Sequence, residues 1–323
     1  MNELSNLIIP RVNINSENSI QDAINLAETF KFDSFILFSS DEVKFEKKKP
    51  FPLSRMADLK KELNKVIPNF YFYIDAERGF GHRCSEGFLW EDDFDSVDSN
   101  SLLNIFNKIN SELKENGIFC NLAPVVDINP KNEKILNNRT LGSSVNSIIK
   151  NVRIFIDSCS YNLIHPCLKH FPGHGALEGD THINLSVSTE NLKNLNELHL
   201  ATFRPFLNQT PLVMVNHGWY KSFDEEILPA SLSKNIISSL LKDQYNFKGL
   251  VIADSIRMKA LSDNYEESYI LESFFNAGGD LLLDPYDPAE CLRQLKLIYK
   301  NNHKSFDKKI HKVLKLKKSG SYE

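Results

Sequence analysis

Cysteine is scarce in this chain of 323 residues, and no two cysteines stand in a Cys-x-x-Cys pair. The five cysteines are Cys84, Cys120, Cys159, Cys167 and Cys291. An odd number without paired spacing argues against a disulfide framework. The pattern is typical of reduced thiols and therefore favours a cytoplasmic protein.

Long apolar runs and a basic leader segment are also missing. No stretch is long enough to cross a membrane, and residues 1–6 lack the basic segment and apolar run of a signal peptide. We therefore expect a cytoplasmic location and no membrane partner. The formal net charge of −4 gives no electrostatic reason to expect a nucleic-acid partner.

Glycine and proline, with 13 residues each, are too few to form long flexible linkers. The length alone would allow two domains, but barrels of strands and helices reach this size as one unit. We find no internal repeat. The sequence therefore predicts a single domain over residues 1–323.

Short apolar runs alternate with segments of helical period along the whole chain. The runs that predict strands are 7–10, 34–38, 70–75, 118–126, 163–171, 212–215, 250–253 and 280–283. The segments that predict helices are 19–30, 53–66, 102–113, 145–156, 191–206, one through 236–241, and 290–299. This alternation predicts an α/β fold in which parallel strands close into a (β/α)8 TIM-type barrel. An open doubly wound sheet is the alternative.

The lysine-rich segment 304–318 has two interpretations. It can be a solvated helical face that holds Ile310, Val313 and Leu316 inward, or a nucleic-acid patch. The acidic balance of the whole chain favours the packed helix.

Polar side chains stand at or just beyond the ends of six predicted strands. They are Asp75, Asp127, Lys169, His170, His217, Asp254 and Asp284. In a barrel, the carboxyl ends of the strands form one rim, and that rim holds the active site. Any one of these residues could be a loop cap or an ion pair, but six strand ends in phase favour a site.

The richest polar cluster runs from Lys169 to Gly175 and continues with Asp180, Thr181 and His182. Two chemistries fit it. His170, His174, Asp180 and His182 include enough nitrogen and oxygen donors for zinc. Alternatively, His182 can act as an acid and base near neutral pH, with its ring held by Asp180 two residues earlier.

Asp254 ends the apolar run 250–253. A carboxylate in this place can be a nucleophile toward the anomeric carbon of a sugar. It can equally cap the next helix.

Taken together, these segments resemble glycoside hydrolase family 3, and most closely its single-domain β-N-acetylhexosaminidases of bacterial cell-wall recycling. The most specific element is the sequence KHFPGHG at 169–175, followed by DTH at 180–182. A second is the segment 240–254, which ends on Asp254. Supporting stretches are APVVD at 123–127, NRTLG at 138–142, VMVNH at 213–217 and PASLS at 229–233. The resemblance covers nearly the whole chain.

The resemblance implies a retaining exo-β-N-acetylglucosaminidase with a barrel fold and no cofactor or metal. Asp254 matches the family's nucleophile, His182 its acid/base, and Asp180 the partner that positions His182. The positions that match sugar-binding residues are Asp75, Arg83, Arg139, Lys169 and His170, with His217 as a further pocket residue. The implied substrate is a small glycan or a muropeptide that ends in N-acetylglucosamine.

Three positions differ from the family's usual pattern. Arg78 stands in place of a glycine, Phe80 in place of an arginine, and Ala253 in place of a serine or threonine. Other activities therefore stay open: a β-glucosidase, a phosphorylase, or a non-catalytic sugar-binding barrel.

Overall fold

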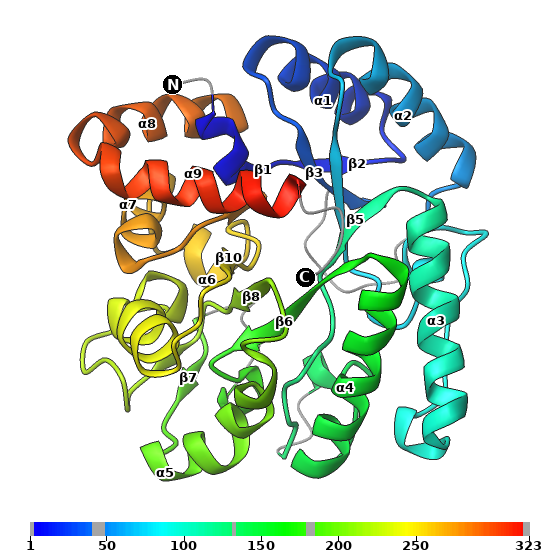
Figure 1. Cartoon of the computed structure of the whole chain (residues 1–323). Helices are drawn as coiled ribbons and strands as arrows, with labels where there is room; N and C mark the ends of the chain where they lie inside the picture. Colours follow the sequence, from blue (N-terminus) through cyan, green and yellow to red (C-terminus); the bar gives the residue numbers. More distant parts are fainter. Residues whose placement is uncertain (1–2, 41–48, 131–133, 179–184, 319–323) are drawn as a thin grey trace.

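The computed structural model describes residues 3–40, 49–130, 134–178 and 185–318. Its centre is a curled parallel sheet of seven strands in the order β10, β8, β6, β5, β4, β3, β2 (Figure 1). The strands are β2 (Arg11–Asn13), β3 (Ser34–Phe38), β4 (Tyr71–Ile74), β5 (Ile118–Asn121), β6 (His165–Phe171), β8 (Leu212–Val215) and β10 (Leu250–Ala253). This order follows the chain without a reversal, which excludes the open doubly wound alternative.

The two edges of this sheet approach each other through β1 (Ile8–Ile9) and β11 (Leu282–Leu283). β1 directly precedes β2 and pairs in parallel with β11. Leu281, next to β11, forms a parallel bridge with Ile252 of β10. These pairings give the sheet its curl.

Helices cover the outside of the sheet (Figure 1). They are α1 (Glu17–Phe30), α2 (Leu53–Val66), α3 (Ser99–Glu115), α4 (Val145–Asn162), α5 (Leu192–Asn194), α6 (Lys259–Ser262), α7 (Glu267–Ala277), α8 (Pro288–Asn301) and α9 (His303–Lys318). The α5 segment continues as irregular helical turns to residue 206, and a further wide helix covers Asn235–Gln244.

Local sequence explains why these elements form. The carboxylate of Asp98 accepts hydrogen bonds from the backbone N–H groups of Asn100 and Ser101 and so caps α3. One face of α3 then buries Leu102, Phe106 and other apolar residues. In β3 all five residues are buried, as expected for a parallel strand covered on both faces.

The predicted strands are confirmed in place; three have the predicted bounds, and the others are shorter than their runs. The run 7–10 forms only β1, which ends before Pro10, a residue with no N–H for the ladder, and β2 begins beyond that run. The run 118–126 ends as a strand at Asn121, shortly before Pro124. The pattern analysis missed α6, α7 and the short strands β2, β7 (Val187–Ser188) and β9 (Trp219–Tyr220).

The lysine-rich segment forms α9, as predicted, and its residues Ile310 and Val313 are buried. The structure corrects one part of that interpretation, because two of its lysines are buried as well. Lys309 donates to the carbonyl of Gly279, and Lys317 donates to Asp33. The lysines of α9 are therefore partly packing and pairing residues, not only solvated ones.

Candidate active site

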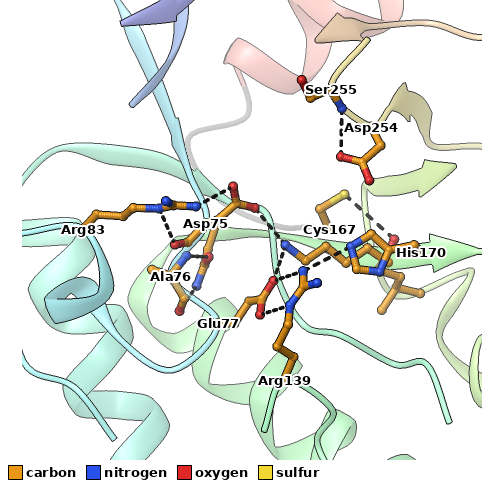
Figure 2. A network of polar contacts seen from close by, with 12 residues as sticks. Asp75, Ala76, Glu77, Arg83, Arg139, Cys167, His170, Asp254 and Ser255 are labelled. Atoms are coloured by element: carbon orange, nitrogen blue, oxygen red, sulfur yellow. Dashed lines mark hydrogen bonds and ion pairs between the residues drawn. The ribbon is translucent and has the colours of Figure 1, made fainter. Parts of the chain in front are cut away.

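Lys169 lies at the centre of a buried cluster of ion pairs. Figure 2 shows its partners Asp75 and Glu77. Its Nζ is 2.8 Å from Oδ1 of Asp75 and 2.7 Å from Oε1 of Glu77. Lys169 comes from β6, whereas Asp75 and Glu77 follow β4. Because parallel strands end at one rim, residues nearly a hundred positions apart meet here.

Arg139 joins the cluster through a two-pronged ion pair with Glu77. Its Nε and Nη2 lie 2.9 Å and 2.7 Å from the two carboxylate oxygens of Glu77. Arg139 Nη2 also lies 3.4 Å from Nε2 of His170. Burial alone would raise the pKa of Glu77, but Arg139 and Lys169 outweigh it and hold this pKa well below its usual value.

Asp75 is held between two cations. In addition to Lys169, Arg83 Nη2 lies 3.1 Å from its Oδ2. Burial would raise the pKa of Asp75, but Lys169 and then Arg83 offset that effect and lower the pKa to about 2. The carboxylate of Asp75 is therefore ionised under all physiological conditions.

The second polar group of the rim is Asp127 with two histidines. Asp127 Oδ2 lies 2.7 Å from His170 Nδ1, and Oδ1 accepts a 2.6 Å hydrogen bond from the backbone N–H of His174. This carboxylate fixes the orientation of the His170 ring. Burial, and then the neighbouring His170, lower the pKa of His174 to about 4, so the His174 imidazole is neutral near pH 7.

Asp254 follows β10, and its carboxylate faces the side of the cluster where His170 lies (Figure 2). The side chain is half-buried, and its Oδ1 accepts a 2.8 Å hydrogen bond from the backbone N–H of Ser255. Burial would lower the pKa of Arg139, but Glu77, Asp75 and, to a smaller extent, Asp254 raise it. The predicted site residues Asp75, Arg83, Arg139, Lys169, His170 and Asp254 therefore share one rim.

His217 also lies on this rim, just beyond β8, but it contacts protein groups. Its Nδ1 is 2.8 Å from the hydroxyl of Ser231, and its Nε2 is 3.1 Å from the carbonyl oxygen of Ser255. The ring is fully buried.

The other two predicted site residues, Asp180 and His182, lie outside the described residues. Asp180 and His182 are also two of the four candidate zinc ligands, so half of that candidate set lies outside the described residues. Within the described ranges, no group of three or more histidine, cysteine, aspartate or glutamate side chains has the arrangement of a metal site.

The structure explains how the chain accommodates Arg78 and Phe80. The guanidinium of Arg78 donates to the carbonyl groups of Trp90, Asp92 and Asn138. The left-handed φ of this turn falls on Gly79, at 126°, so no glycine is needed at position 78. Phe80 is buried and packs edge-on against Phe51.

Sequence reasoning did not assign a site role to Glu77, which pairs with both Lys169 and Arg139. Its signal was available, since it stands two residues beyond Asp75 in the same strand-end segment. Asp127 was placed at a strand end, but its contact with His170 depends on tertiary structure.

A cavity of about 430 Å³ opens near the ends of β10 and β11. Ile256 and Tyr286, two residues beyond Asp254 and Asp284, line it together with Tyr265, Glu266 and Glu267. Carboxylates and phenol groups of this kind can hydrogen-bond to a hydroxyl-rich ligand.

The chain belongs to glycoside hydrolase family 3. A family model described as "Glycosyl hydrolase family 3 N terminal domain" matches residues 3–316. This match confirms the resemblance that the motifs indicate.

Relatives and solved structures agree with this assignment. A β-hexosaminidase of Neisseria meningitidis serogroup C is 25% identical over 244 residues, which are 72% of this chain and 67% of that protein. β-Hexosaminidase A of Pseudoalteromonas piscicida is 27% identical over 194 residues, which cover 56% of this chain but 32% of that longer protein. A family 3 β-N-acetylglucosaminidase from a Paenibacillus species has the same fold, with a TM-score of 0.85 and 24% identity over 99% of this chain and 62% of that one.

No helix in the described part of the chain has the length and apolar character needed to span a bilayer.

The lowered pKa of Asp75 predicts how folding depends on pH. The folded pKa is about 2, against roughly 3.9 in an unfolded chain, so ionised Asp75 stabilises the fold above about pH 4. This contribution, on the order of 2 kcal/mol, is lost as the pH falls from about 4 to about 2. Denaturant unfolding over this range should show that Asp75→Asn loses less stability than the wild type does.

The control for this experiment is Asp243→Asn, which removes an exposed aspartate from the wide helix. Its free energy of unfolding should depend on pH as steeply as that of the wild type. If the free energy of unfolding of Asp75→Asn falls as steeply with pH as that of the wild type, the ion-pair account is contradicted.

Proposed function

We propose that the chain is a retaining exo-β-N-acetylglucosaminidase that removes terminal N-acetylglucosamine from small glycans. The observation that carries this proposal is the position of Asp254, whose carboxylate faces a fixed cluster of polar side chains on the same rim. Membership of family 3 and the β-hexosaminidases among its relatives support the activity and the sugar.

In this proposal the carboxylate of Asp254 attacks the anomeric carbon and forms a covalent glycosyl-enzyme. The transition state resembles an oxocarbenium ion, which an anion beneath the ring stabilises. One oxygen of Asp254 accepts the Ser255 N–H, and the other is the attacking atom. Displacement by Asp254 and then by water retains the anomeric configuration.

The ion-pair cluster is assigned to sugar binding. Asp75 is an acceptor that stays ionised, whereas Lys169, Arg83 and Arg139 are donors, so together they suit the hydroxyl and N-acetyl groups of the sugar. Because these side chains already contact one another, their positions are fixed before the sugar arrives. His170, oriented by Asp127, and His217 complete the proposed set.

The acid/base is assigned to His182, with Asp180 as its positioning partner. A histidine with a pKa near neutrality can protonate the leaving oxygen and then deprotonate the incoming water. The site requires no cofactor and no metal in this mechanism.

The finer structural and biological assignments are also proposals. The pairing of β1 with β11, and of Leu281 with Ile252, supports one closed barrel of eight strands and a single domain over residues 1–323. The proposed substrate is a muropeptide, and the proposed location is the cytoplasm.

Removal of the nucleophile tests the proposal. We expect the wild type to hydrolyse a chromogenic N-acetyl-β-glucosaminide, and Asp254→Asn to lower kcat at least about 10³-fold, because the amide cannot form the glycosyl-enzyme. The matched control is Asp243→Asn, which should keep wild-type turnover.

Other outcomes would change the assignment. Cleavage of a glucoside instead of the N-acetylglucosaminide would indicate a β-glucosidase. Sugar 1-phosphate that forms only with phosphate present would indicate a phosphorylase. Sugar binding without turnover, unchanged in Asp254→Asn, would indicate a non-catalytic barrel.

The leaving group should reveal the role of His182. We expect His182→Ala to reduce turnover of a substrate with a sugar leaving group by about 10²- to 10⁴-fold, because the departing oxygen then lacks a proton donor. A nitrophenyl leaving group needs little protonation, so its release should fall much less. Asp180→Asn should show the same selectivity in weaker form. Equal losses on both substrates would rule out the acid role.

A further inference from the structure

The segment that carries Asp254 is fixed by a second buried polar network, separate from the ion pairs around Lys169. Its central residue is Ser255, which is 7% exposed. The backbone N–H of Ser255 donates to Asp254, and its hydroxyl donates a 2.6 Å hydrogen bond to Oδ2 of Asp284. Its carbonyl oxygen lies 3.1 Å from Nε2 of His217. Every polar group of Ser255 therefore has a partner.

Asp284 is a firm anchor for the Ser255 hydroxyl. It is fully buried just beyond β11, and two arginines neutralise it. Arg11, from β2, donates through Nε and Nη2 at 3.0 and 2.5 Å, and the Nε of Arg257 lies 3.0 Å from Oδ1. Because a buried carboxylate with two cationic partners is costly to displace, the Ser255 hydroxyl meets a fixed acceptor.

His217 anchors the other side of Ser255. With Nε2 donating to the Ser255 carbonyl, Nδ1 is left to accept from the hydroxyl of Ser231, which lies 2.8 Å away. These two contacts hold the ring in one orientation. Ser255 is thus held from β8 on one side and from β11 on the other, while its own strand, β10, lies between them.

We infer that Ser255, clamped by Asp284 and His217, is a positioning residue that sets the direction of the Asp254 carboxylate. This inference rests on the proposed role of Asp254 as the nucleophile. The Ser255 N–H holds one carboxylate oxygen of Asp254, so a shift of Ser255 would turn the whole carboxylate. Ser255 itself touches no reacting atom.

The experiment compares Ser255→Ala with the wild type on the chromogenic N-acetylglucosaminide. The variant keeps the backbone N–H but loses the hydroxyl bond to Asp284. We expect kcat to fall about 10- to 100-fold, because a small misplacement of a reacting group costs this much. The inhibition constant of free N-acetylglucosamine should stay within about twofold of the wild type, since the sugar-binding cluster is untouched.

Three further variants complete the design. Ser255→Thr keeps the hydroxyl and should restore most of kcat. Ser238→Ala removes a half-buried hydroxyl from the wide helix, where it donates to the carbonyl of Ala277 outside the network, and should keep wild-type kcat. Ser231→Ala removes the hydroxyl that His217 Nδ1 contacts but keeps Ser255, and it should lower kcat by a smaller factor.

Several results would overturn the inference. One is an unchanged kcat in both Ser255→Ala and Ser231→Ala. Another is a fall in the kcat of Ser255→Ala that is matched by weaker binding of N-acetylglucosamine, because that result indicates a general loosening of the site. A wild type that turns over no sugar substrate would instead refute the proposed function, and the positioning role with it. If the wild type is active and the serine variants keep its kcat, only the positioning role is refuted.

Discussion

The site depends on a buried ammonium group, that of Lys169, held between the carboxylates of Asp75 and Glu77. A charge in this position is costly unless it is paired, so the two carboxylates and the lysine must be placed together. Arg139 and Arg83 then extend the pairing outward from each carboxylate. The result is a surface of fixed donors and acceptors whose side chains need little rearrangement to receive a polar ligand.

The curled parallel sheet makes this pairing possible. It brings residues from β4, β6 and the 134–142 segment to one rim, and it brings Asp254 to the same rim from β10. Asp75, Glu77 and Asp254 stand just beyond the ends of their strands, and Lys169 lies near the end of β6. The second network, around Ser255 and Asp284, links β10 with β8, β11 and β2, so both networks stabilise the rim that they form.

Much of this rim could be predicted from the sequence because the strands are short apolar runs and polar residues follow them in phase. Asp75, Lys169, His170 and Asp254 were found in this way, and the motif resemblance added Arg83 and Arg139. Glu77 was not assigned although it stands two residues beyond Asp75, and its pairing with Lys169 and Arg139 shows only in the fold. Ser255 was not assigned because its partners Asp284 and His217 are distant in the chain. Arg78 illustrates the same limit, since only the fold shows that the positive φ falls on Gly79.

The most direct test of the account asks which carboxylate becomes bonded to the sugar. The protein would be treated with a slow-turnover fluorinated analogue of N-acetylglucosamine, digested, and its peptides weighed by mass spectrometry. The account predicts that the peptide containing Asp254 gains the mass of one sugar. A label on another carboxylate, or continued hydrolysis with no labelled peptide, would contradict it.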